Sequence, residues 1–186
     1  MRFFQILAPQ RAPLALAEIR AFLRLDHEDD DALLASLLEA AVEACESFTG
    51  RALISQGWRL LAPWPLDRRL RLGHGPVQTV DAVRRKSMDG TSSDIAANSY
   101  WLDQSQDPAL LHIVGGDGTL AWPGGGQIEV DFRSGYGDDW NAVPMSLRQG
   151  LLRLIAHQYQ VRDSHDGGAM PSAVAALWAP FRTPRL

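Results

Sequence analysis

The stretch that decides the fold is residues 127–137, QIEVDFRSGYG, followed after a short acidic loop by Val143-Pro144 and a long helical pattern. The first six residues alternate polar and apolar side chains, which is typical of a half-buried strand. Gly135 and Gly137 predict a sharp turn, and proline is favoured in the first turn of a helix. This join therefore predicts a strand, a turn and a docked helix, and it contains no catalytic group.

The length and composition indicate a protein that buries a sizeable core. The chain has 186 residues, of which 46% are hydrophobic. No run approaches the ~18 consecutive apolar residues of a membrane span, and the first residues lack the pattern of a signal peptide. The single cysteine, Cys45, excludes an internal disulfide and fits a reducing compartment. Its place on an apolar helical stripe favours a small buried side chain over a nucleophile.

Charge is distributed unevenly along the chain, whose net charge is −4. Residues 1–50 carry four basic and nine acidic side chains, whereas residues 144–186 carry five basic and two acidic ones. Opposite charges at the two ends of the sequence suit contacts between neighbouring molecules in an assembly. The sequence shows no dense Lys/Arg stripe with interleaved aromatic residues, which a broad nucleic-acid-binding face would require.

The first and last parts of the sequence have helical periodicity. Residues 13–49 predict two helices joined by an acidic linker, and residues 144–186 predict a long helix, a loop and a short helix from Pro171. Gly50 is placed to end the second helix in the left-handed conformation. Gly150, inside the long helix, costs about 1 kcal/mol relative to alanine, which suggests that another element approaches closely there.

The middle of the sequence, residues 51–143, has the alternation and glycine-rich turns of a β region. The predicted strands span residues 53–61, 69–72, 77–85, 100–102, 110–114 and 127–132. We therefore predict an α+β fold in which residues 1–50 and 144–186 form a helical bundle. The antiparallel β-rich region is an insertion into that bundle, and the whole is expected to behave as a single structural unit.

Two kinds of motif could be mistaken for binding sites. The acidic run at residues 26–31 lacks the glycine and the distal glutamate of a calcium loop, so helix capping by Asp29 or Asp30 explains it better. The glycine clusters that begin near residues 115 and 123 are not followed by Lys-Ser/Thr and do not open a helix. We interpret both clusters as hairpin turns, and we expect no cofactor.

Catalytic groups are scarce. His157, His165, Asp163 and Asp166 could be imagined as a metal or acid–base cluster, but the eight-residue gap between the histidines matches no known ligand spacing. The sequence contains no paired cysteines, no nucleophile motif and no zinc-protease motif. The sequence therefore favours a protein that is not an enzyme, with no catalytic or metal-binding residue.

Four segments carry a family resemblance. They are residues 13–34 (PLALAE, then FLR, an acidic spacer and ALL), 49–54 (TGRALI), 130–162 and 171–182. Together they resemble the head–tail connector family, the portal adaptors of long-tailed phages and gene transfer agents, over nearly the whole chain. One departure is Ala15, where the family often has Ser or Thr forming a capping box with an acidic residue such as Glu18.

The resemblance implies a structural role in a virion. Family members form a ring, usually of twelve copies, below the portal; the ring extends the DNA channel and joins the capsid to the tail. The implied partners are the portal protein, a stopper or tail-terminator protein, and other copies of the chain. Packaged DNA would pass through without sequence-specific binding, and no membrane is involved. The implied location is the neck of a phage or phage-like particle, assembled in the bacterial cytoplasm.

The resemblance also implies a docking arm, because C-terminal segments of the family tend to contact the portal. The residues expected to form this portal-docking arm are Trp178, Phe181, Arg182, Arg185 and Leu186. A second set is expected to be architectural, returning the chain from the β region to the helical body. That set is Gly50, Gly135, Tyr136, Gly137 and Pro144.

An alternative function depends on the tryptophans, five of whose six positions fall between residues 51 and 143. If several were exposed together, the β region could be a receptor- or sugar-binding module of the virion. Packing in a small core and its interfaces explains them more economically. The connector ring is therefore the first hypothesis and the binding module the alternative.

Overall fold

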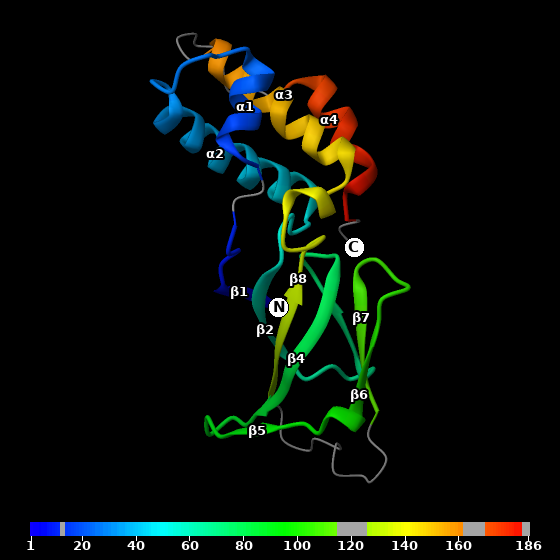
Figure 1. Ribbon diagram of the computed structural model, residues 1–186. Coiled ribbons are helices and arrows are strands. Elements are labelled where there is room, and N and C mark those ends of the chain that lie inside the picture. The colour runs from blue at the N-terminus through cyan, green and yellow to red at the C-terminus, as the bar shows by residue number, and fades with distance from the viewer. Residues whose placement is uncertain (12–13, 115–125, 162–169, 184–186) are drawn as a thin grey trace. The chain divides into compact units, whose positions relative to one another are not determined.

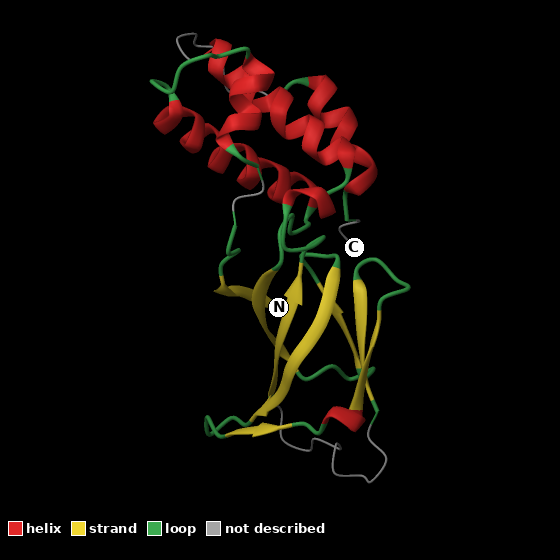
Figure 2. Cartoon of the chain, in the orientation of Figure 1, coloured by secondary structure: helices red, strands yellow, loops and turns green. Residues whose placement is uncertain are grey.

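The chain folds into two compact units, which are described separately. The computed structural model describes residues 1–11, 14–114, 126–161 and 170–183. One unit is formed by residues 1–10 and 55–135, and the other by residues 11–54 and 136–186. The first contains the strands and the second the four α-helices (Figures 1 and 2). The α+β fold class predicted from the sequence is confirmed.

The β unit consists of two antiparallel sheets. The larger has five strands in the order β1-β2-β8-β4-β5, and the smaller has three in the order β3-β7-β6. The bounds are β1 Arg2–Leu7, β2 Gln56–Pro63, β3 Arg69–Leu72, β4 Val77–Lys86, β5 Ser92–Asp94, β6 Tyr100–Asp103, β7 Ala109–Ile113 and β8 Gln127–Ser134, with a 3-10 turn, η1, at Ala97–Ser99. The last strand of this unit, β8, therefore pairs with β2 and β4 in the middle of the larger sheet.

One face of each sheet supplies the core of the β unit. Leu60, Val130 and Phe132 point inward from the five-stranded sheet and are fully buried. Leu70 and Leu111 meet them from the three-stranded sheet. Burying each such side chain contributes about 1.5–3 kcal/mol relative to leaving it in water, so this shared core holds the two sheets together.

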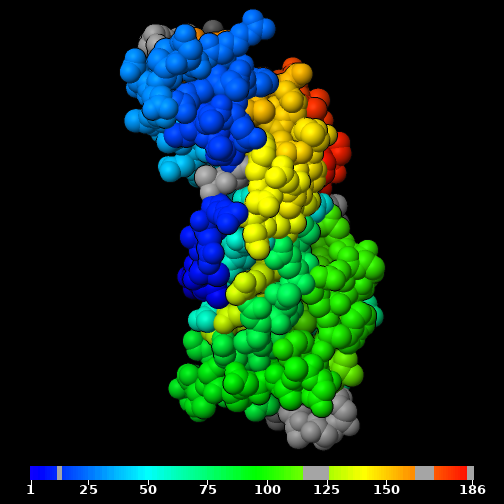
Figure 3. Space-filling view, viewed as in Figure 1, coloured from blue at the N-terminus to red at the C-terminus, as the bar shows by residue number. Residues whose placement is uncertain are grey.

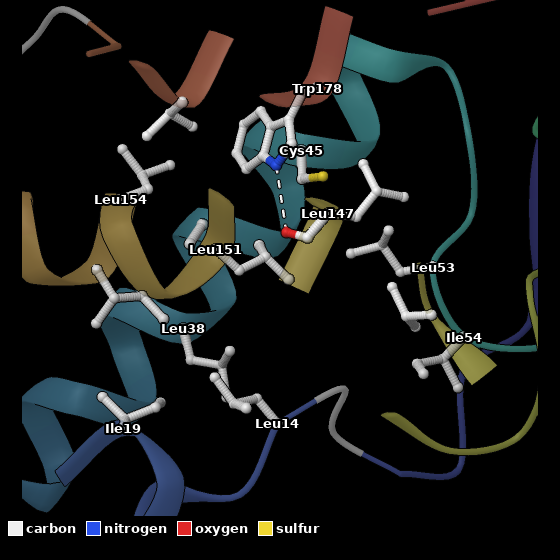
Figure 4. Packing of buried hydrophobic residues seen from close by; sticks show 14 of the residues in the cluster. Leu14, Ile19, Leu38, Cys45, Leu53, Ile54, Leu147, Leu151, Leu154 and Trp178 are labelled. Carbon is white, nitrogen blue, oxygen red and sulfur yellow. Dashed lines mark hydrogen bonds between the residues drawn. The ribbon is translucent and has the colours of Figure 1, made fainter. Parts of the chain in front are cut away.

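The helical unit is a bundle of α1 (Leu16–Leu23), α2 (Asp31–Thr49), α3 (Met145–Val161) and α4 (Ser172–Trp178). Short 3-10 turns, η2 at Trp140–Ala142 and η3 at Ala179–Phe181, flank α3 and α4. α3 packs against the other three helices, and α4 also touches α2. Leu38 of α2 meets Leu147 and Leu151 of α3 in the core (Figure 4). Leu34 and Ile155 belong to the same buried cluster. The stripes that predicted both long helices are the buried faces.

The boundaries between the units differ from the sequence prediction. Residues 1–10 belong to the β unit rather than the helical body, because β1 pairs with β2. Residues 51–54 and 136–143 belong to the helical unit, because Leu53 and Val143 are buried in its core. That the two units behave as a single structural unit stays a prediction.

The starts of the first two helices show how far the local sequence determines helix capping. Pro13 lies outside the described residues, and α1 begins at Leu16. The carboxylate of Glu18 accepts a hydrogen bond from the N–H of Ala15 at 3.4 Å, so half of a capping box forms without the hydroxyl. Asp30 is the N-cap residue of α2, one of the two positions expected, but its side chain makes no capping hydrogen bond and accepts one from the Tyr159 hydroxyl of α3. The predicted position of the cap is therefore confirmed, whereas capping by the Asp30 side chain is not.

Candidate interaction surfaces

Trp178 holds the last helix in the core of the helical unit. Its side chain is fully buried, and its indole N–H donates to the carbonyl of Leu147 at 3.3 Å (Figure 4). Gly150 of α3 leaves room for the ring, because a Cβ at that position would lie 2.0 Å from Nε1 of Trp178. The close approach predicted at Gly150 is confirmed. Trp178 therefore positions the C-terminal segment and offers no contact surface of its own, contrary to its assignment to the docking arm.

The segment after α4 is fixed to the C-terminal end of α2. Nε of Arg51 donates to the carbonyl of Phe181, and the N–H of Thr183 donates to the carbonyl of Thr49 at 2.8 Å. Gly50 ends α2 with φ +72°, so the left-handed stop predicted there is confirmed. The hydroxyl oxygen of Thr183 lies 3.4 Å from the place of a Cβ on Gly50. The turn that ends α2 thus receives the C-terminal segment.

Two residues of the expected docking arm lie at the surface of the helical unit. Phe181 is half-buried and Arg182 is exposed. The guanidinium of Arg182 lies over the ring of Phe48, 5.1 Å from its centroid, a contact worth about 0.5–1 kcal/mol at an exposed site. Arg185 and Leu186 lie outside the described residues. The described part of the arm is therefore an apolar and a cationic side chain held at one end of α2.

The join between β8 and the helical unit begins at a glycine. Gly135 has φ +134°, a conformation that favours glycine, and its N–H donates to the carbonyl of Pro76 at 2.9 Å. The next residue, Tyr136, donates its N–H to the carbonyl of Leu53 at 3.1 Å. Gly135 therefore ends the β unit, and Tyr136 makes the first contact within the helical unit.

The rest of the join prepares the start of α3. A Cβ on Gly137 would lie 2.5 Å from the Cβ of Ala142, so the loop can fold this closely only around glycine. The carbonyl of Pro144 accepts hydrogen bonds from the N–H groups of Leu147 and Arg148 at 3.0 and 3.1 Å. Helical hydrogen bonding therefore starts at Pro144, as the sequence predicts.

An ion cluster that the sequence does not predict lies on the outer face of the five-stranded sheet. Asp131 of β8 lies between Arg59 of β2 and Arg84 of β4. Nε and Nη2 of Arg59 reach its carboxylate at 2.7 and 2.8 Å, and Nη1 of Arg84 reaches it at 2.7 Å and Glu129 at 2.9 Å. Burial alone raises the pKa of Asp131, but hydrogen bonds from the two guanidinium groups outweigh it and hold that pKa below its ordinary value. The cluster links three neighbouring strands.

The opposite charges of the two sequence ends meet in one unit. Both the acidic N-terminal helices and the basic C-terminal helices belong to the helical unit. Arg20 of α1 pairs with Glu28 of the α1–α2 linker at 2.7 Å and with Asp31, the first residue of α2, at 3.6 Å. Glu43 of α2 and Arg153 of α3 are exposed. This unit therefore presents both signs of charge on its own surface.

The described residues offer no chemical centre. Within them, no three His, Cys, Asp or Glu side chains lie close enough together to hold a metal ion. His157 is half-buried on α3, and Asp163, His165 and Asp166 lie outside the described residues. Cys45 is fully buried, and burial raises the pKa of its thiol, so the thiol stays protonated and unreactive. No helix in the described parts of the chain is long and apolar enough to cross a bilayer.

The tryptophans assigned to the β region divide between surfaces and cores. Trp101 is 50% exposed, whereas Trp58 and Trp64 are half-buried against the β core. Trp140 belongs to the helical unit, and Trp122 lies outside the described residues. In the described part of the β unit, a single tryptophan is therefore broadly exposed, which is fewer than a sugar platform requires.

Comparisons with known proteins converge on one family. Residues 14–83 match the family described as phage gp6-like head-tail connector protein. Among solved structures, a chain from the neck of an empty gene transfer agent (GTA) particle, computed with C6 symmetry, is 35% identical, with a TM-score of 0.83. A chain from the virion of a native GTA particle has the same identity and TM-score, and one from a native GTA neck computed with C12 symmetry has 35% and 0.76. Each match covers 100% of this chain and 97% of the other. Curated proteins yield no match.

Proposed function

Because the chain belongs to the family of gp6-like phage head–tail connector proteins, we propose that it forms a ring in a particle neck between the portal and the tail. It is a structural protein of the virion, and its ring extends the DNA channel and presents a surface to a stopper or tail-terminator protein. The observation that carries this proposal is the 35% identity to GTA neck chains over the whole of this chain and 97% of theirs.

The proposed ring contains twelve copies. In support, one similar chain comes from a GTA neck computed with C12 symmetry. A closed ring needs two different and complementary surfaces on each copy. The helical unit carries exposed Glu39 and Glu43 on α2 and exposed Arg153 on α3, so surfaces of opposite charge are present within one unit. We assign these helices to contacts between neighbours.

The C-terminal segment is the proposed contact with the portal. Trp178 and the hydrogen bond from Thr183 to Thr49 fix the start of this segment, so the residues that follow leave from a defined point. Deleting residues 184–186 while keeping Thr183 should weaken co-sedimentation of the protein with purified portal rings. Arg71→Ala serves as the control, because it removes an exposed arginine of the β unit, outside this segment and outside the helices assigned to contacts between neighbours. Unchanged co-sedimentation of the deletion variant would contradict the assignment.

DNA is proposed to pass the ring without sequence-specific binding. The net charge of −4 supports this, because binding to DNA depends mainly on neutralising phosphates with basic side chains. Filter binding of the purified protein to duplex DNA at about 50 to 200 mM salt should detect no retention that depends on sequence. Retention of one duplex over a scrambled duplex of equal length would contradict this part of the proposal.

Deleting the gene in a cell that produces the particles tests the whole proposal. We expect DNA-filled heads without attached tails, and tailed particles again when the gene is supplied from a plasmid. Electron microscopy of negatively stained particles would count both forms. Normal numbers of tailed particles without the gene would refute a connector role.

A further inference from the structure

We propose that strand β1 is an open edge of the β unit and pairs with an extended segment of a different neck protein. The inference rests on the proposed place of the chain in a particle neck. β1 is the outermost strand of the five-stranded sheet and pairs on one side with β2. Its residues lie at the surface of the β unit, dark blue in Figure 3. The other side of β1 faces no strand among the described residues, so its main-chain groups form a template for pairing.

β1 lacks most features by which edge strands avoid pairing. Phe4, Ile6 and Leu7 are 41%, 48% and 43% exposed, and the six-residue strand contains no proline and one charged side chain, Arg2. Its irregularity is a register shift just before Leu7. The shift is accommodated by Gly57 of β2, where a Cβ would lie 2.8 Å from the Cβ of Leu7. The β1 edge of the larger sheet is therefore apolar and regular up to this shift.

The opposite edge of the same sheet, formed by β5 and the part of β4 beyond it, has features that oppose pairing; we call it the guarded edge. β5 has three residues, ends in the exposed Asp94 and pairs with the last three residues of β4. Farther along β4, Nε2 of Gln104 donates to the carbonyls of Val77 and Gln78, both at 3.0 Å. Two register shifts interrupt the strand near the exposed Asp81. Such devices oppose pairing with another strand, so this edge of a second copy is a poor partner for β1.

A second copy is also disfavoured by symmetry. Pairing of β1 with β1 of another copy uses the same surface twice, which joins copies in twofold pairs and does not propagate around a ring. The other edges that a copy could offer are the guarded β4–β5 edge of the larger sheet and the strands β3 and β6 of the smaller one, which have four residues each and carry Arg69, Arg71 and Asp103. We therefore assign the partner strand to a different protein of the neck.

Charge and side-chain pattern define the chemistry of that segment. Residues 1–10, the N-terminal part of the β unit, contain Arg2 and no acidic side chain. In the pairing of β1 with β2, Phe4 lies opposite Arg59, and the guanidinium of Arg2 lies 5.1 Å from the centroid of the Phe4 ring. The complementary segment has apolar side chains that cover the exposed edge and a carboxylate that meets Arg2. Main-chain hydrogen bonds would supply affinity and these side chains specificity.

Photo-crosslinking in assembled particles identifies the occupant directly. Phe4 is replaced by p-benzoylphenylalanine, particles are purified, and the crosslinked peptides are sequenced by mass spectrometry. We expect an adduct with an extended, acidic segment of a different neck protein. An adduct with a second copy of this chain, or no adduct in particles that contain the variant, overturns the proposal.

Hydrogen exchange provides a readout that needs no substitution. Amides of residues 2–7 should exchange roughly tenfold or more slowly in intact particles than in the isolated protein, because a paired edge must open before it exchanges. Equal exchange in both preparations overturns the inference while leaving the connector function standing. Tailed particles formed without the chain would instead refute the connector function, so the two failures are distinguishable.

A matched pair of variants tests the consequence for assembly. Ile6→Lys places a charge on the open edge, a change that opposes strand pairing, and should lower the yield of tailed particles about tenfold. Leu66→Lys makes the same chemical change at a fully exposed site in the loop after β2 and should leave the yield unchanged. Thermal unfolding of both purified variants checks that each has folded. Equal yields from two folded variants contradict the proposal.

Discussion

The helical unit and the β unit differ in how completely each buries and pairs its own packing surfaces. In the helical unit, Trp178 fills the space above Gly150, and Thr183 is bound to the end of α2. The β unit has an equally well-buried core around Phe132, but among the described residues one edge of its larger sheet, β1, pairs with no further strand. Substitutions in the core of the helical unit should therefore have the largest effects on stability, whereas the β1 edge is where we expect a partner to bind.

The largest expected effect comes from removing the ring that closes the helical unit. Trp178→Ala should lower the free energy of unfolding by about 3–5 kcal/mol, because it deletes a fully buried aromatic side chain and leaves a cavity. Trp101→Ala is the matched control in the β unit, where half of the side chain is already exposed. Urea denaturation followed by circular dichroism measures the free energy of unfolding of both variants. Equal losses would show that the buried Trp178 contributes no more to stability than the half-exposed Trp101.

Filling the space under that ring is the next largest change. Gly150→Ala should destabilise the protein by about 2 kcal/mol, because overpacking against Trp178 costs more than the ~1 kcal/mol that alanine contributes to helix propensity. Gln160→Ala, on the exposed side of α3, should change stability by less than about 0.5 kcal/mol. A stabilised Gly150→Ala variant would mean that α4 does not approach α3 so closely.

In the β unit, substitutions in the ion cluster around Asp131 test its contribution to stability. Asp131→Asn should cost about 1–2 kcal/mol, because Arg59 and Arg84 lose the carboxylate between them. Asp81→Asn breaks an exposed pair with Arg133 and should cost ~0–1 kcal/mol. Chemical denaturation at neutral pH compares the two variants. Equal losses of stability would show that the ion cluster around Asp131 contributes no more than the exposed ion pair of Asp81.

The same cluster makes a pH prediction with a definite sign. The pKa of Asp131 is held below its ordinary value, so its contribution to stability is fully present above the unfolded value of about 3.9. That contribution is lost as the pH falls through the folded-state pKa. Stability curves of the wild type and Asp131→Asn should therefore converge under acid conditions, and a constant gap down to low pH would contradict the assignment.

The smallest effect is expected where the helical unit receives its C-terminal segment. Gly50→Ala should cost about 1 kcal/mol, because φ is +72° there and a Cβ strains that conformation. Ala40→Gly, at an exposed position inside α2, costs about the same through helix propensity and is a matched comparison. Proteolysis of the C-terminal segment should be faster in Gly50→Ala alone, since Thr183 packs against this turn.

The helices were predictable because their signals are local. Leu34, Leu38 and Cys45 lie on one side of α2 by spacing alone, and all three are buried. The close approach at Gly150 was also predictable, since glycine inside a long helix has a propensity cost that needs a reason. Its partner, Trp178, was not, because the contact joins two helices whose packing no local pattern specifies.

The missed features all depend on pairing between strands, most of them far apart in the sequence. Phe3 and Phe4 are adjacent apolar residues, so β1 shows no clear alternation, and it becomes a strand through pairing with β2 more than 50 residues later. The short polar strand β5 forms through a local hairpin with β4, and its own side chains show no strand pattern. The ion cluster on Asp131 requires β8 to lie between β2 and β4, an order that spacing along the chain does not specify. The open edge follows from that same order.

Electron cryo-microscopy of the particle neck, reconstructed with and without imposed symmetry, would show whether the chain forms the proposed ring. We expect a closed ring of twelve copies of this chain between the portal and the tail, with the DNA channel running through it. A tailed neck whose density contains no copy of the chain, or holds it outside a closed ring, would refute the proposed connector ring.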